Sequence, residues 1–329
     1  MGRCDEFAVS QSKDEIQSYS NRTNAPTDFP WHLPHVNIYF KELKKFLAAW
    51  NSDCVFEMEQ EAKLELSHDL DYVRKTTSLR LKQSAFNLYN AFTKRKVSKL
   101  KKSFQFLFGT GKYWCFDYWM EVEKKKGMVS TFYVYSKQSK SAKKWLLDPS
   151  YNVSKDVKLQ NQLKSMLEQG WKIGLHGSFY SADDLELITK EKESLELAVG
   201  HKVTATRQHW LRYFEHQTPL IHEQLFQTDS TVGWNDRVGF RAGIASKYKP
   251  YNHKEGRAFD YFVIPQVVMD SNIFDYGFGR EEEITDLAIS LLDQCKKLGN
   301  THVAISWHPR TCAKDYNWHL AYERILASW

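Results

Sequence analysis

The chain has 329 residues, of which 42% are hydrophobic and 26% charged, enough for one barrel-sized domain or two smaller ones. No apolar run reaches membrane-spanning length, and the five scattered cysteines form no C-x-x-C pair, which argues against a disulfide framework. The first residues lack the apolar stretch of a signal peptide, so we expect a cytoplasmic protein.

The net charge of +6 is concentrated in one run, residues 94–102, where six of nine residues are basic. Such a run can contact nucleic acid, anionic lipid or an acidic glycan, although a solvated helix face is the simpler interpretation. No zinc finger or other nucleic-acid module accompanies it, so we expect no nucleic-acid partner. A peripheral membrane contact through 94–102 stays open, and the sequence does not predict an oligomeric state.

The N-terminal part is predicted to be an arm and a helical cap, residues 1–60. Residues 1–28 are polar, which is typical of a loose arm. The spacing of Leu43, Phe46 and Trp50 then predicts a helix near 38–50. The remaining chain, 61–329, is predicted to form one α/β domain.

The first predicted strand, 62–67, leads into the sequence LELSHDLDY and its two acids, Asp69 and Asp71. Side chains alternate along a strand, so these two acids point to the same side. The following residues, about 72–128, read as a helical and basic insertion. It includes a helix over 113–126, which Gly127 closes.

From there strands and helices alternate, which predicts a parallel sheet or barrel. Pro265 places its strand at an edge or at the rim of a barrel. Ser181 is expected to cap the second of the four helices. The predicted strands are 129–135, 171–175, 202–205, 226–229, 260–269 and 302–306, and the predicted helices are 155–169, 182–198, 218–226 and 281–298.

Polar side chains gather at the ends of these strands, where parallel α/β folds build their sites. They are Asp69, Asp71, His176, Arg207, His209, Asp229 and His308. Each of them taken alone also fits a structural role, as a loop cap, a surface ion pair or a buried histidine. Their recurrence at one strand end after another is what indicates a site.

Asp71 and His176 are the mixed oxygen and nitrogen ligands that suit Zn²⁺ or a similar divalent metal. His209 is the best candidate for the third ligand, and His68, Ser181 and Tyr180 are weaker ones. A bound metal would lower the pKa of a water molecule.

Acid–base roles fall to the remaining residues. Asp69 is predicted to be the general base, kept ionised by Arg207, and His308 in SWHPR is predicted to be the general acid. The loop DSTVGWNDRVGFRAG would bring further side chains to the mouth of the site. We assign substrate binding to Asp229, Trp234, Arg241 and Trp307.

Taken together, the motifs resemble those of the polysaccharide deacetylase family, the NodB-like carbohydrate esterases. S-H-D-L-D resembles that family's T-F-D-D-G, and L-H-G-S-F-Y-S around His176 resembles its H-[ST]-x-x-H. Arg207 in R-Q-H-W resembles R-x-P-Y, Asp229 and Trp234 resemble the Asp/Trp motif, and S-W-H at His308 resembles L-x-H. The resemblance covers residues 62–310 and is closest to a divergent branch associated with surface-polysaccharide biosynthesis.

This resemblance implies a distorted (β/α) barrel with a helical N-terminal cap and a helical insertion after the first strand. It implies metal-dependent removal of an acetyl group from an N-acetylated sugar or glycan intermediate. Tyr180 stands where the family has its second motif-two histidine, and His209 replaces the motif-three proline. Two alternatives therefore remain: an inactive homologue that binds carbohydrate, and a hydrolase of a non-sugar amide.

Overall fold

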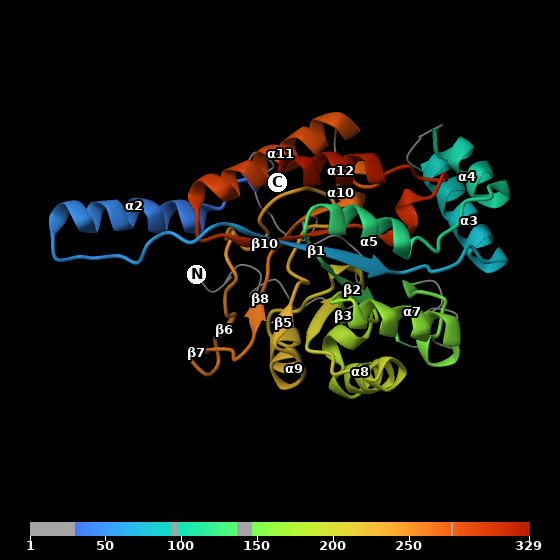
Figure 1. The fold of residues 1–329 in the computed structure, drawn as a ribbon, viewed down its shortest axis with the longest axis horizontal. Helices are drawn as coiled ribbons and strands as arrows, with labels where there is room; N and C mark the ends of the chain where they lie inside the picture. Colours follow the sequence, from blue (N-terminus) through green and yellow to red (C-terminus); the bar gives the residue numbers. More distant parts are fainter. Residues whose placement is uncertain (1–29, 94–97, 137–146, 278) are drawn as a thin grey trace.

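The computed structural model describes residues 30–93, 98–136, 147–277 and 279–329 (Figure 1). The arm predicted over 1–28 and the first part of the basic run, 94–97, lie outside the described residues. Within the described parts, no helix has both the length and the apolar character that crossing a membrane requires.

The centre of the molecule is a sheet of eight parallel strands in the order β8-β5-β4-β3-β2-β1-β10-β9. The strands are β1 (Lys63–Leu70), β2 (Ser130–Val134), β3 (Lys172–Gly177), β4 (Ala205–Gln208), β5 (Thr228–Asp229), β8 (Phe262–Val263), β9 (Gln266–Met269) and β10 (His302–Ser306). A separate antiparallel hairpin is formed by β6 (Tyr251–Asn252) and β7 (Arg257–Ala258).

The two edge strands of the sheet, β8 and β9, are neighbours in the chain. Only Ile264 and Pro265 separate them, so the two edges lie within about 10 Å of each other and the sheet must curl. Pro265 has no N–H to donate, and its carbonyl accepts from the Ala304 N–H at 2.8 Å. The result is the predicted distorted (β/α) barrel, with the predicted strand 260–269 bent in two at Pro265.

Helices surround the sheet, and most of them lie on its outer face (Figure 1). They are α2 (His35–Trp50), α3 (Thr77–Thr93), α4 (Ser98–Phe108), α5 (Phe116–Lys125), α7 (Val157–Glu168), α8 (Leu185–Val199), α9 (Thr218–Leu225), α10 (Asp270–Phe274), α11 (Glu281–Leu298) and α12 (His319–Ser328). The core between helices and strands contains large buried aromatic side chains, among them Trp119, Phe132, Trp307 and Tyr322.

Several boundaries differ from the prediction for a local reason. Strand β4 begins later than expected and contains Arg207, because Arg207 is in register with His176 on β3. Helix α8 is capped by Asp184, whose carboxylate accepts from the Leu187 N–H at 2.9 Å, and not by Ser181. The Ser181 hydroxyl instead donates a hydrogen bond to the Ser178 carbonyl at 3.0 Å.

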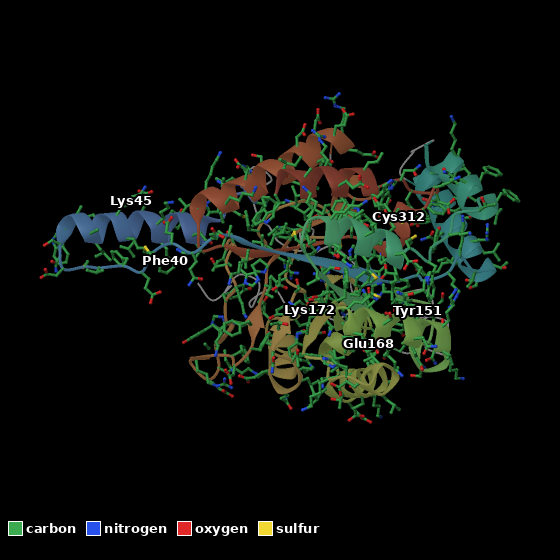
Figure 2. The ribbon with its side chains drawn as sticks, viewed as in Figure 1. Phe40, Lys45, Tyr151, Glu168, Lys172 and Cys312 are labelled. Carbon is green, nitrogen blue, oxygen red and sulfur yellow. The ribbon has the colours of Figure 1, made fainter. Side chains whose placement is uncertain are left out.

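Two helical elements stand at opposite ends of the molecule (Figure 1). Helix α2 forms where predicted, but it projects from the barrel and buries none of its residues. Phe40 and Lys45 on this helix are both exposed (Figure 2). Helices α3 and α4, within the predicted insertion, pack against each other at the other end. The division into 1–60 and 61–329 stays a prediction.

Candidate metal centre and active site

The carboxyl ends of four parallel strands meet in one place and supply the candidate site. Asp71 follows β1, His176 is the second-last residue of β3, His209 follows β4 and His308 follows β10. Because these strands run in the same direction, residues far apart in the sequence are brought to one edge of the barrel.

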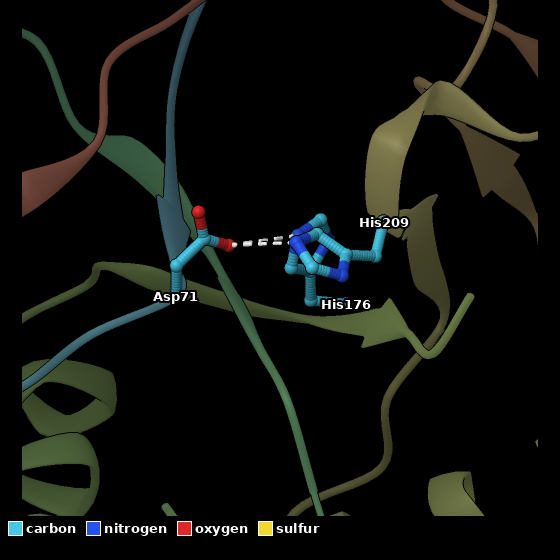
Figure 3. Close-up of side chains that lie close together, drawn as sticks. All are labelled: Asp71, His176 and His209. Carbon is cyan, nitrogen blue, oxygen red and sulfur yellow. Dashed lines mark ion pairs between the residues drawn. The ribbon is translucent and has the colours of Figure 1, made fainter. Parts of the chain in front are cut away.

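Three of these side chains form a compact cluster (Figure 3). Asp71 Oδ1 lies 3.3 Å from His176 Nε2 and 3.6 Å from His209 Nε2. One potential ligand atom from each residue lies within 4.8 Å of the other two. One oxygen and two nitrogens at such distances can converge on a single divalent ion and leave a coordination position open.

Hydrogen bonds to the far ring nitrogens orient both imidazoles. His176 Nδ1 lies 2.9 Å from the Arg207 carbonyl oxygen, which can only accept, so Nδ1 carries the proton and Nε2 offers a lone pair. His209 Nδ1 lies 3.2 Å from Asp148 Oδ1, which also accepts from the Phe179 N–H at 2.8 Å. Both Nε2 atoms are thereby directed into the cluster.

The polar atoms of this cluster fit a cation. Asp71 Oδ1 and His176 Nε2 are buried and have no hydrogen-bond partner, although buried polar atoms are normally satisfied. Both atoms are acceptors, so a shared cation satisfies them together. Burial alone would lower the pKa of His176, but the carboxylates of Asp69 and Asp71 raise it, which shows that this point favours positive charge. The donor set therefore suits a divalent metal.

A strained turn directs His209 toward the cluster. Trp210 and Leu211, the next two residues, have φ values of 61° and 51°, a left-handed conformation that non-glycine residues rarely adopt. Two bonds hold the turn: Asn235 Nδ2 donates to the Trp210 carbonyl and the Trp210 indole donates to the Leu147 carbonyl, both at 2.9 Å. The strain is concentrated beside a candidate metal ligand.

Asp69 is paired with a fully buried arginine. Arg207 Nη1 donates to Asp69 Oδ1 at 2.7 Å, and the other guanidinium donors bind Ser67, Ser230 and Ser306. Burial alone would raise the pKa of Asp69, but Arg207, with His176 and His308, lowers it. Asp69 is therefore an ionised carboxylate in a fixed position, as its predicted role requires.

His308 is held between two carboxylates. Its Nδ1 lies 2.7 Å from Asp270 Oδ1, its backbone N–H donates to Asp270 Oδ2 at 2.9 Å, and its Nε2 lies 3.1 Å from Asp71 Oδ2. Burial would lower the pKa of His308, but Asp270 and Asp71 together raise it to about 10. Arg310 donates to Asp71 Oδ2 at 3.1 Å. The second oxygen of Asp71 is thus held by cations from the β10 side.

All these groups open onto one cavity of about 660 Å³. Its walls come from the strand ends, from the helical insertion and from the segment after β10. The lining includes Asp69, Asp71, Tyr72, Leu81, Lys82, Ala85, Phe106, His176, Gln208, His209, Trp210, Asn235, His308, Arg310, Tyr316 and Trp318.

Three residues of the site were not predicted. Asp270 follows β9, so the rule of polar residues at strand ends would have found it had Pro265 not obscured that strand. Arg310 lies in the motif SWHPR, two residues after His308, and received no role. Asp148 lies in a loop between β2 and α7, and no sequence signal marks it.

The four predicted substrate-binding residues are placed elsewhere. Asp229, Trp234, Arg241 and Trp307 are all buried and none lines the cavity. Asp229 binds His222 and Thr231, and Trp234 packs against Trp31. Asp229 does not steady Arg207 either, because Ser230 does so. Their contacts are with neighbouring residues of the fold, so the lining of the cavity does not support their assignment to substrate binding, which stays a prediction.

The weaker ligand candidates are also placed away from the cluster. His68 is buried on the other face of β1, where it binds the Trp307 carbonyl and Glu123. The Ser181 hydroxyl donates to the Ser178 carbonyl, and Tyr180 does not line the cavity. Among the described residues, the cluster of Asp71, His176 and His209 is the one group of histidine and acidic side chains that converges like a metal site.

Comparisons with known proteins agree with this architecture. No family model matches the chain, and no curated protein matches its sequence. A Mycobacterium smegmatis protein classed as a polysaccharide deacetylase is similar in structure: it is 15% identical, the match covers 83% of this chain and 85% of that chain, and the TM-score is 0.50.

Two further solved structures are similar. A Pseudomonas aeruginosa PAO1 protein classed as a polysaccharide deacetylase is 14% identical, with 81% and 84% of the two chains covered and a TM-score of 0.48. An allantoinase is 13% identical, with 96% and 90% covered and a TM-score of 0.48. The likeness to the mycobacterial protein shows the fold: the chain has the distorted (β/α) barrel of polysaccharide deacetylases.

Proposed function

We propose that this protein is a metal-dependent hydrolase that removes an acetyl group from an N-acetylated sugar or glycan intermediate in surface-polysaccharide biosynthesis. One observation carries the proposal. A single cavity brings together an ionised carboxylate, a histidine with a raised pKa and a cluster of three ligand atoms, two of which are buried without hydrogen-bond partners. A protein that only binds glycan needs neither the base nor the acid.

Asp71, His176 and His209 are the residues that would hold the metal, and their oxygen and nitrogen donors suit zinc best. When bound, such an ion polarises a carbonyl group and lowers the pKa of water. Asp148 and the Arg207 carbonyl keep the two imidazoles aimed at that position.

Asp69 and His308 divide the proton transfers. Asp69, kept ionised and oriented by Arg207, accepts a proton from the attacking water. His308 carries the proton that the leaving amine needs, and Asp270 holds its ring in place through Nδ1. The raised pKa of His308 fits the acid, and the lowered pKa of Asp69 fits the base.

The cavity supports a sugar more than a small amide. A volume of about 660 Å³ falls in the range for ligands well above the size of a compact amide. Tyr72, Trp210 and Trp318 give it aromatic walls, while Gln208 and Asn235 add amide groups. Aromatic rings stack on the C–H faces of pyranoses, and amides bind their hydroxyl groups.

Elemental analysis of the purified protein tests the metal site first. We expect about one zinc-like ion per chain, lost in both Asp71→Ala and His209→Ala and retained in His201→Ala, which changes an exposed histidine. Acetate release from N-acetylated nucleotide sugars then tests the reaction. Absence of metal after incubation with Zn²⁺, Co²⁺ or Ni²⁺, together with glycan binding, would favour the inactive carbohydrate-binding alternative.

A further inference from the structure

The helical insertion carries an extreme charge bias. Residues 72–116 contain eleven lysines and arginines and no aspartate or glutamate, whereas the net charge of the whole chain is only +6. Residues 94–97 within it lie outside the described residues, so the surface considered below is built from α3 and α4 alone. Segregation of charge on this scale marks a surface that meets an anionic partner.

The same two helices expose large apolar side chains. Phe92 on α3 and Phe108 on α4 are 73% and 72% exposed. The complete set of exposed large apolar residues on the two helices is Leu81, Leu88, Tyr89, Phe92, Phe104 and Phe108. A concentration of large exposed apolar side chains on one helix pair is uncommon on a soluble protein and indicates an interaction site.

Contacts within the fold fix how these helices are presented. Ser84 and Ser103 each donate to the other's carbonyl at 2.9 Å, which joins α3 to α4. Lys75 forms a buried ion pair with Asp315 at 2.5 Å, and Arg80 donates to the Gly109 carbonyl at 2.7 Å. Lys75 and Arg80 therefore serve the fold, whereas Lys101 on α4 is exposed and carries surface charge.

We propose that the α3–α4 pair is a docking surface for an anionic lipid bilayer. Basic residues beside exposed Phe, Tyr and Leu are the combination that binds a membrane interface, since lysines meet lipid head groups while the apolar rings enter the acyl boundary. Nucleic acid or an acidic glycan would match the charge but would leave Phe92, Phe104 and Phe108 exposed to water.

The docking surface is continuous with the candidate active site. Leu81, Ala85, Leu88 and Phe92 follow one another at helical spacing along one face of α3. Leu81 and Ala85 line the cavity, as does Phe106 of α4, while Leu88 and Phe92 lie on the exposed surface. A docked protein would hold its cavity against the bilayer. Resting on the proposed function, this arrangement points to an acetylated sugar that is attached to a lipid.

Vesicle co-sedimentation of the full chain tests the docking surface without any enzymatic readout. We expect the protein to sediment with vesicles of phosphatidylcholine and phosphatidylglycerol, and not with phosphatidylcholine alone. The double variant Phe92→Ser, Phe108→Ser should bind at least about tenfold more weakly, because two apolar side chains no longer enter the interface. Lys101→Glu should weaken binding at least about fivefold and reduce its salt dependence.

The matched control is Phe46→Ser on α2, a residue with 64% exposure at the opposite end of the molecule, which should leave vesicle binding unchanged. No sedimentation with the anionic vesicles would overturn the docking surface, as would equal losses for Phe46→Ser and the double variant. Binding to heparin or DNA that survives the double variant, with no vesicle binding, would assign the charge to another polyanion.

The outcome is separable from the proposed reaction. Asp71→Ala, which removes a candidate metal ligand, should still bind the anionic vesicles fully. Acetate release from water-soluble N-acetylated sugars by a protein that ignores vesicles would uphold the reaction and reject the docking surface.

Discussion

Strand β1 and Asp71, which follows it, take part in two acid–histidine contacts, one on each face of the sheet. On the helix-covered face, His68 contacts Glu123 at 2.6 Å, and Glu123 also accepts from Tyr322 at 2.9 Å and from Trp171 at 3.2 Å. On the other face, Asp71 lies 3.3 Å from His176, and both facing atoms lack hydrogen-bond partners. Both contacts are buried, so burial does not distinguish structure from function. The two contacts differ in whether their polar atoms have hydrogen-bond partners.

The largest effect is expected from Asp69→Asn, which lies beside the Asp71–His176 contact. The amide has nearly the shape of the carboxylate but cannot accept the proton of the attacking water. We expect metal content to stay unchanged while turnover falls about 10³- to 10⁴-fold. Elemental analysis and an acetate-release assay on the same preparation measure the two effects. Full activity in this variant would remove Asp69 from the role of base.

A substitution in the His68–Glu123 contact should have the opposite effect, lowering stability and leaving the metal site unchanged. Glu123→Ala leaves His68, Trp171 and Tyr322 without their shared acceptor, so we expect a loss of about 3 to 5 kcal/mol in unfolding free energy. Metal content of the folded protein should not change. Denaturant unfolding followed by fluorescence measures the loss.

Glu121→Ala on the same helix is the control for this prediction, since Glu121 forms only an exposed ion pair with Lys125. Its unfolding midpoint should match that of the unsubstituted protein. A Glu123→Ala variant that is as stable as the control but loses metal would show that the two faces of β1 act as one site.

The smallest effect is expected at Asp148, which contacts the cluster of Asp71, His176 and His209 from outside. Asp148→Ala removes the acceptor that orients His209, so metal affinity should fall about 10- to 100-fold. Asp148→Asn retains an oxygen acceptor and should restore most of the affinity. Competition with a coloured chelator measures both values. Unchanged affinity in Asp148→Ala would mean that the turn at Trp210 and Leu211 alone orients His209.

The sequence alone was enough to locate the site residues that lie at the ends of the predicted strands. The residues concerned lie in or just after β1, β3, β4 and β10, where the alternation of helices and strands is clear; they are Asp69, Asp71, His176, Arg207, His209 and His308. Parallel pairing of these strands then brings their carboxyl ends to one edge of the barrel, whatever the conformation of the connecting loops. Arg207 bound to Asp69 follows the predicted pairing because both residues lie at this edge.

Side-chain direction within loops could not be predicted in the same way. Trp234 and Arg241 belong to a glycine-containing loop without periodicity, so no pattern indicates which side chains turn inward. Trp307 and His308 directly follow β10, and their side chains point in opposite directions: Trp307 is buried in the core and His308 lines the cavity. The contribution of α3 and α4 to the cavity wall depends on tertiary packing that the sequence pattern of an insertion does not contain.

The pairing of β1 with β10 has a consequence for how the protein is made. Lys63 is in register with His302, at the far end of the chain. A nascent chain therefore presents β1 with one side unpaired until nearly all residues have been synthesised, and such non-local closure is slow. Asp71 and His308 can meet only after that last step. Every form that ends before β10 therefore lacks the complete candidate site.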